Sequence, residues 1–184
     1  MKELLASNVI YADNADKLVL KELNEKGQKP IATVIACSDS RVPVEIIFNQ
    51  LTPGILFVIR VAGNIVADPS VTGSIEYAVE HLKTPYVIVL GHTKCGAITA
   101  YLEGATGGEV GKLLKQVHLH SREINEAVIE NVAVQVKNVM GLSSVKEALN
   151  SREIEIYGMI YDLESGIIKP ININGENMPS SVNK

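Results

Sequence analysis

Three short apolar runs, each ended by turn or polar residues, constrain the fold of this chain more than any other feature of its sequence. They occupy residues 31–36, 55–59 and 86–90. Continuous apolar runs of this length are typical of strands that are covered on both faces, as in a parallel sheet. A fourth run at residues 154–160 and a short segment at 166–169 flank a turn, so we expect them to form a hairpin.

Helix-like patterns lie between these runs. We expect helices over residues 12–26, 42–48, 70–82, 97–102, 110–139 (with a break) and 143–149. Strands that alternate with helices predict an α/β fold. The expected domain is a single one over residues 1–184, with a central, mainly parallel sheet of about four parallel strands plus one antiparallel edge strand, flanked by helices. We expect residues 1–27 to form an N-terminal helical arm and residues 172–184 to form a mobile tail.

Composition excludes several classes of function. The net charge of -4 and the pI near 5.6 give no overall electrostatic reason to bind nucleic acid or an anionic membrane. No apolar run reaches the length of a membrane span. The first residues lead into the charged stretch at 13–26 without an apolar core, so we expect a cytoplasmic protein without a secretory signal. Two cysteines are too few for a disulfide framework.

The positions of the two cysteines predict a metal site. Cys37 directly follows the first predicted strand, and His92 follows the third. Because the carboxyl ends of parallel strands meet at one edge of a sheet, these side chains are expected to lie close together. Cys95 completes a His-x-x-Cys step at the start of a helix. Two thiolates and one imidazole, with a fourth position left for water, are typical of a catalytic zinc site, in which the pKa of the bound water falls to about 7.

Asp39 and Arg41 follow Cys37 at alternate positions. In an extended segment all three side chains would point to one side. An arginine fork keeps a neighbouring carboxylate ionised and oriented. Asp39 could then accept a hydrogen bond from water on the metal, or it could bind the metal as a fourth ligand. The residues alone leave both possibilities open.

Other interpretations of these residues are weaker. A single cysteine at a strand end is more often a buried apolar residue than a ligand, but three candidate ligands together favour a metal. Thiol redox chemistry lacks a Cys-x-x-Cys motif. The segment 91–97 lacks the glycine spacing of a nucleotide-binding loop. We expect His118 and His120 to make surface or partner contacts.

The chain resembles the β-class carbonic anhydrases over about residues 28–170. It carries both signature motifs of that family, Cys-x-Asp-x-Arg at Cys37 and His-x-x-Cys at His92. Residues 58–64, 74–79 and 157–162 extend the similarity. The resemblance implies one zinc ion per chain and the reversible hydration of carbon dioxide to bicarbonate and a proton. It also implies a homodimer, often assembled further, whose active site lies at the interface.

The resemblance also implies a substrate pocket. Members similar to the plant enzymes line it with a glutamine, a phenylalanine and a tyrosine, and Gln28, Phe57 and Tyr77 stand at the matching positions. The amide of the glutamine can donate to a bicarbonate oxygen while the aromatic rings exclude bulk water. The backbone N–H of Gly96 is expected to serve Asp39 or bicarbonate.

A second branch of the family traps bicarbonate with a tryptophan, an arginine and a tyrosine. This chain has no tryptophan: Val34 stands at that position, although Arg60 and Tyr161 remain. The resemblance therefore implies an open site in which Asp39 pairs with Arg41 rather than with zinc.

Two further functions are compatible with the same residues. Some relatives hydrolyse carbon disulfide or carbonyl sulfide on the same fold. A zinc- or bicarbonate-binding sensor without useful turnover is the other alternative, but it would need neither the Asp39/Arg41 pair nor Gln28.

Overall fold

In the described part of the chain, the central sheet contains five strands in the order β2-β1-β3-β4-β5. The computed structural model describes residues 1–172, so the predicted tail lies outside the described residues except for Asn172. The strands are β1 Ala32–Ala36, β2 Leu56–Arg60, β3 Tyr86–His92, β4 Glu155–Tyr161 and β5 Ile168–Ile171. Strands β1 to β4 are parallel, and β5 is antiparallel to β4. The predicted α/β fold with one antiparallel edge strand is confirmed.

Helices connect the strands close to the predicted positions. They are α1 Lys2–Asn14, α2 Lys17–Lys26, α3 Val44–Ile47, α4 Pro69–Glu80, α5 Gly96–Leu102, α6 Gly108–Leu114, α7 Ile124–Gly141 and α8 Ser143–Asn150, with a short 3-10 helix, η1, at Ala62–Asn64. The break expected within residues 110–139 separates α6 from α7. None of the helices within residues 1–172 combines the length and the apolar character needed to cross a bilayer.

The prediction of one helix over residues 12–26 was wrong. The structure has two helices there, and the chain is extended at Ala15 and Asp16 between them. The Asp16 side chain accepts hydrogen bonds from the N–H groups of Leu18 and Val19. Such an aspartate cap starts a new helix, because it satisfies N–H groups that have no partner within the helix.

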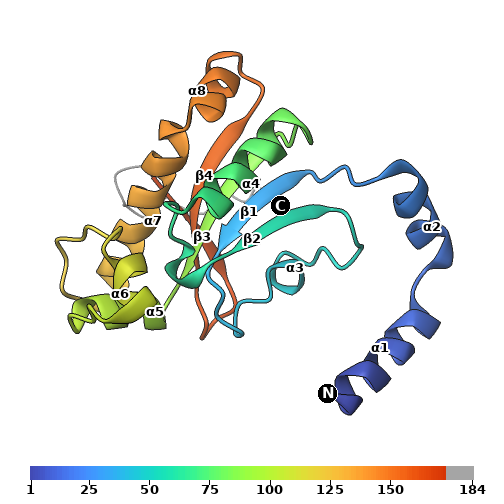
Figure 1. The fold of residues 1–184 in the computed structure, drawn as a ribbon, viewed down its shortest axis with the longest axis horizontal. Coiled ribbons are helices and arrows are strands. Elements are labelled where there is room, and N and C mark those ends of the chain that lie inside the picture. Colours follow the sequence, from blue (N-terminus) through green and yellow to red (C-terminus); the bar gives the residue numbers. More distant parts are fainter. Residues whose placement is uncertain (173–184) are drawn as a thin grey trace.

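The two faces of the sheet are covered unequally (Figure 1). Helices α4, α5, α7 and α8 pack against one face over a large apolar core. A smaller core on the other face includes Val42 and Val44, the first residue of α3. Helices α1 and α2 extend away from the sheet, and none of their residues is buried. The N-terminal segment therefore has the form of an arm.

A close approach of α7 to the sheet depends on glycine. Val132 of α7 lies over Gly91 of β3 and Gly158 of β4, and a Cβ atom at Gly91 would overlap its side chain. Glycine at this point lets the helix backbone lie nearer the strands than any other residue would allow. The packing fixes α7 above the carboxyl end of β3, beside the predicted site.

Candidate metal centre

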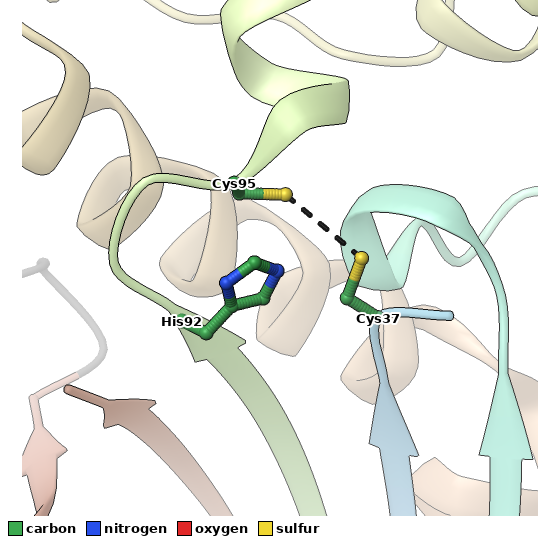
Figure 2. Close-up of side chains that lie close together, drawn as sticks. All are labelled: Cys37, His92 and Cys95. Atoms are coloured by element: carbon green, nitrogen blue, oxygen red, sulfur yellow. Dashed lines mark hydrogen bonds between the residues drawn. The ribbon is translucent and has the colours of Figure 1, made fainter. Parts of the chain in front are cut away.

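Three buried side chains converge at the carboxyl ends of β1 and β3 (Figure 2). Cys37 follows β1, His92 is the last residue of β3, and Cys95 is the N-cap of α5. Strands β1 and β3 are parallel neighbours in which Ala36 is paired with Leu90. This register brings Cys37 beside the end of β3, as the sequence predicted.

The spacing of the ligand atoms fits a tetrahedral metal ion. The Sγ atoms of Cys37 and Cys95 are 3.9 Å apart, and all three ligand atoms lie within 4.8 Å of one another. Two sulfurs that bind zinc tetrahedrally at the usual bond length would be about 3.8 Å apart. The two thiolates would also balance the charge of a divalent cation. We conclude that the side chains already have the arrangement that such an ion requires.

The imidazole of His92 is oriented for metal binding. Its Nδ1 atom lies 2.9 Å from the carbonyl oxygen of Thr93, which can only accept a hydrogen bond, so Nδ1 carries the proton. Its Nε2 atom is buried and has no hydrogen-bond partner among the described residues. An unpartnered buried nitrogen is costly unless it binds something. A metal ion at the centre of the cluster would use this lone pair.

The thiols of Cys37 and Cys95 lie within hydrogen-bond distance of each other, and this contact affects the pKa of both. The hydrogen bond from Cys95 lowers the pKa of Cys37, and contacts with His92 and Gly63 act in the same direction against the opposite effect of burial. The same sulfur–sulfur contact, together with burial, raises the pKa of Cys95. Thiolate character at this point is what a soft divalent cation selects.

Asp39 and Arg41 pair beside the cluster, although the segment between them is not extended. It forms a turn in which the N–H of Val42 donates to the carbonyl of Asp39. The guanidinium of Arg41 donates through Nε to Oδ1 at 2.9 Å and through Nη2 to Oδ2 at 2.6 Å. These hydrogen bonds lower the pKa of Asp39 despite partial burial. Asp39 Oδ2 lies 3.8 Å from Nε2 of His92, so an ionised carboxylate borders the candidate metal position.

Two supporting contacts were not predicted from the sequence. The guanidinium of Arg60 donates to the carbonyl oxygens of Cys37 and Asp39. The N–H of Gly63 donates to Cys37 Sγ at 3.3 Å. In the sequence, Arg60 and Gly63 stand out only as members of the motif at residues 58–64. Their contacts with the Cys37 segment could not be predicted, because both depend on how the chain turns at the end of β2.

The residues predicted for the substrate pocket do not meet the cluster within one chain. Gln28 is exposed and precedes β1, whereas Cys37 follows that strand. Phe57 is paired with Thr33, four residues before Cys37, a separation of about 13 Å along the strand. Its ring lies 6.1 Å from that of Tyr77, which is 45% exposed. Gly96, by contrast, is exposed next to Cys95 at the first position of α5.

Comparisons of the sequence and of the structure with known proteins all match this chain to carbonic anhydrases. The family model described as carbonic anhydrase matches residues 32–168. Carbonic anhydrase 2 of Mycobacterium tuberculosis is 38% identical over 154 residues, which cover 76% of this chain and 73% of that protein. A carbonic anhydrase of Pseudomonas aeruginosa is 36% identical over 79% of this chain and 74% of its own. A tetrameric β-carbonic anhydrase from Sordaria macrospora superposes with a TM-score of 0.85 at 30% identity, over 93% of this chain and 96% of that chain.

Proposed function

Because this chain belongs to the β-carbonic anhydrase family, we propose that it catalyses the reversible hydration of carbon dioxide to bicarbonate and a proton. One zinc ion per chain would be held by Cys37, His92 and Cys95. The observation that carries the proposal is the buried cluster of two thiols and the unpartnered Nε2 of His92, within 4.8 Å of one another and bordered by an ionised Asp39.

The chain itself positions the reacting water. When bound, zinc supplies a Lewis acid that makes hydroxide available near neutral pH. Asp39 accepts a hydrogen bond from the reacting water through Oδ2 and turns the oxygen lone pair towards the carbon of the substrate. Arg41 contacts both carboxylate oxygens, so Asp39 stays ionised and keeps its orientation. We propose an open site, in which Asp39 remains paired with Arg41 and does not bind the metal.

A second copy of the chain would complete the substrate pocket. Gln28, Phe57 and Tyr77 lie away from the cluster of their own chain, and Tyr77 and the α1–α2 arm are exposed. In a homodimer these residues would reach the cluster of the partner. The amide of Gln28 would donate to a bicarbonate oxygen, the two aromatic rings would exclude bulk water, and the N–H of Gly96 would donate to bicarbonate or to Asp39.

Removal and return of the metal would test the proposed reaction. Carbon dioxide hydration should disappear after dialysis against a strong zinc chelator and should return when one equivalent of zinc per chain is added. Carbon disulfide and carbonyl sulfide are assayed in parallel on the same preparation. Faster turnover of either sulfur compound than of carbon dioxide, or hydration that survives loss of the metal, would contradict the proposal.

A further inference from the structure

Helix α7 carries a row of three amide side chains that runs from the core to the protein surface. Asn131, Gln135 and Asn138 are spaced at i, i+4 and i+7, so they lie along one side of the helix. Asn131 and Gln135 are buried, with 1% and 0% of their surface exposed. Buried amides are costly unless their polar atoms are hydrogen-bonded. The hydrogen-bond partners of these amides therefore show which part of the chain they position.

The row is hydrogen-bonded to both ends of segment 63–66, which follows β2. Asn131 Nδ2 donates to the carbonyl of Gly63 at 2.9 Å. Gln135 Oε1 accepts from the N–H of Val66 at 2.8 Å. The amides also bind each other, since Gln135 Nε2 donates to Asn131 Oδ1 at 3.1 Å and Asn138 Nδ2 donates to Gln135 Oε1 at 3.0 Å. Helix α7 is thus hydrogen-bonded to the first and the last residue of segment 63–66.

Segment 63–66 begins with two residues in the left-handed backbone conformation. Gly63 and Asn64 are consecutive residues with φ angles of 68° and 49°. Left-handed conformation costs glycine little, but it is uncommon for a residue with a side chain, although asparagine adopts it more readily than most. This conformation aims the N–H of Gly63 at Cys37 Sγ, 3.3 Å away. The carbonyl oxygen of the same glycine receives the hydrogen bond from Asn131.

We propose that Asn131 and Gln135 are positioning residues of the metal centre. They hold the N–H of Gly63 on the sulfur of Cys37 and so set the electron density that this ligand offers to the metal. The inference depends on the zinc centre proposed above. Outer groups that hydrogen-bond to metal ligands typically change metal affinity by about 10–100-fold when they are removed.

The test compares two buried substitutions in the same helix. Asn131→Leu keeps the approximate volume but removes the hydrogen bond to Gly63. Val136→Ala is the control, because Val136 is 2% exposed on α7 and its truncation destabilises the core without removing a hydrogen bond. Zinc affinity is measured by competition with a chromophoric chelator. The thiolate-to-cobalt absorption band of the Co²⁺-loaded protein reports directly on the sulfur.

We expect Asn131→Leu to bind zinc about 10–100-fold more weakly than the wild type. Its cobalt band should move to longer wavelength, since a sulfur without its hydrogen bond holds its electrons less tightly. Val136→Ala should match the wild type in both measurements. If Asn131→Leu does not fold, Asn131→Ser, whose hydroxyl is too short to reach the carbonyl of Gly63, should show the same changes.

Two outcomes would contradict the inference in distinguishable ways. Wild-type affinity and an unshifted band in a folded Asn131 variant would show that the amide row serves only the stability of the fold, while the zinc centre would stand. Failure of the wild-type protein to bind zinc or cobalt would overturn the proposed metal centre, and the positioning role with it.

Discussion

Three hydrogen bonds from Arg41 hold the carboxylate of Asp39 at the border of the Cys37, His92 and Cys95 cluster. They keep the pKa of Asp39 below its ordinary value, although partial burial acts in the opposite direction. Asp39 is therefore ionised near neutral pH, where its carboxylate accepts hydrogen bonds and donates none. This role would distinguish Asp39 from Cys37, His92 and Cys95, which we propose to bind the metal.

Asp39→Asn should separate metal binding from catalysis. The substitution keeps the shape of the side chain but replaces an acceptor oxygen with a donor amide, so the reacting water loses its orienting partner. We expect the variant to retain one zinc per chain and to hydrate carbon dioxide about 10²–10⁴-fold more slowly. Stopped-flow hydration and metal analysis on the same sample check this. Wild-type turnover in the variant would remove Asp39 from the mechanism.

At the scale of the elements, the contact between α7 and the sheet can be tested at Gly91. A methyl group there would overlap Val132, whose β-branched side chain has little freedom to move. Gly91→Ala is therefore expected to lower the free energy of unfolding by about 1–3 kcal/mol. Urea denaturation at a fixed protein concentration measures the effect.

Two further variants identify the cause of that loss. Val132→Ala in the Gly91→Ala background should recover part of the stability, because it removes the overlapping atoms. Gly141→Ala is the matched control, since nothing lies within 4 Å of a Cβ atom at Gly141. It should leave stability unchanged or raise it by up to about 1 kcal/mol. Additive losses in the double variant would refute the overlap.

Glu130 of α7 gives the chain a pH-dependent contact. Its carboxylate accepts hydrogen bonds from the N–H groups of His120 and Ser121 and from the ring of His120. Burial alone would raise the pKa of Glu130, but these hydrogen bonds outweigh it and the pKa is lowered. A lowered pKa stabilises the folded state above the ordinary glutamate value, about 4.3, and this contribution disappears as the pH falls through the folded value.

Glu130→Gln should therefore be less stable than the wild type at pH 7, and the difference should shrink below about pH 4. Urea unfolding at several pH values provides the measurement. Glu109→Gln serves as the control, because the Glu109–Lys112 ion pair is exposed and contributes little. A stability difference for Glu130→Gln that is constant with pH would mean that the negative charge of Glu130 is not what stabilises its contact with His120 and Ser121.

Sequence patterns predicted the elements better than the turns between them. The apolar runs located β1 to β4, because parallel strands leave a signal that does not depend on distant contacts. The antiparallel strand β5 was predicted as the hairpin partner of β4, at 166–169 instead of the observed Ile168–Ile171. The break at Asp16 and the turn after Cys37 were missed, since each is made by one side chain that bonds to nearby N–H groups. The contacts of Arg60 and Gly63 with the Cys37 segment require the relative position of two strands, which no local pattern specifies.

At the scale of the whole molecule, one chain holds the candidate metal ligands and the residues predicted for the substrate pocket in separate places. Mixing two defective variants tests whether a second copy joins them. The Cys37→Ala variant lacks one candidate metal ligand but keeps Gln28. The Gln28→Ala variant keeps all three candidate ligands but lacks the glutamine. In a hybrid dimer, one of the two sites would combine the intact cluster of one chain with the intact Gln28 of its partner.

We expect an equal mixture, unfolded and refolded together, to recover up to about a quarter of the wild-type hydration rate, since half of the dimers are hybrids with one intact site each. Each variant refolded alone is the control. A rate equal to the average of the two separate variants would show that Gln28 does not act across an interface. The mass in solution, compared with 19.9 kDa for one chain, is measured on the same samples.

The most direct test of the central claim compares the zinc-loaded wild type with Cys37→Ala in stopped-flow carbon dioxide hydration. If Cys37, His92 and Cys95 hold a catalytic zinc ion, the wild type should contain one zinc per chain and hydrate carbon dioxide rapidly. Cys37→Ala, which cannot complete the cluster, should lose the metal and fall to the uncatalysed rate. Equal rates in the two proteins would contradict the account.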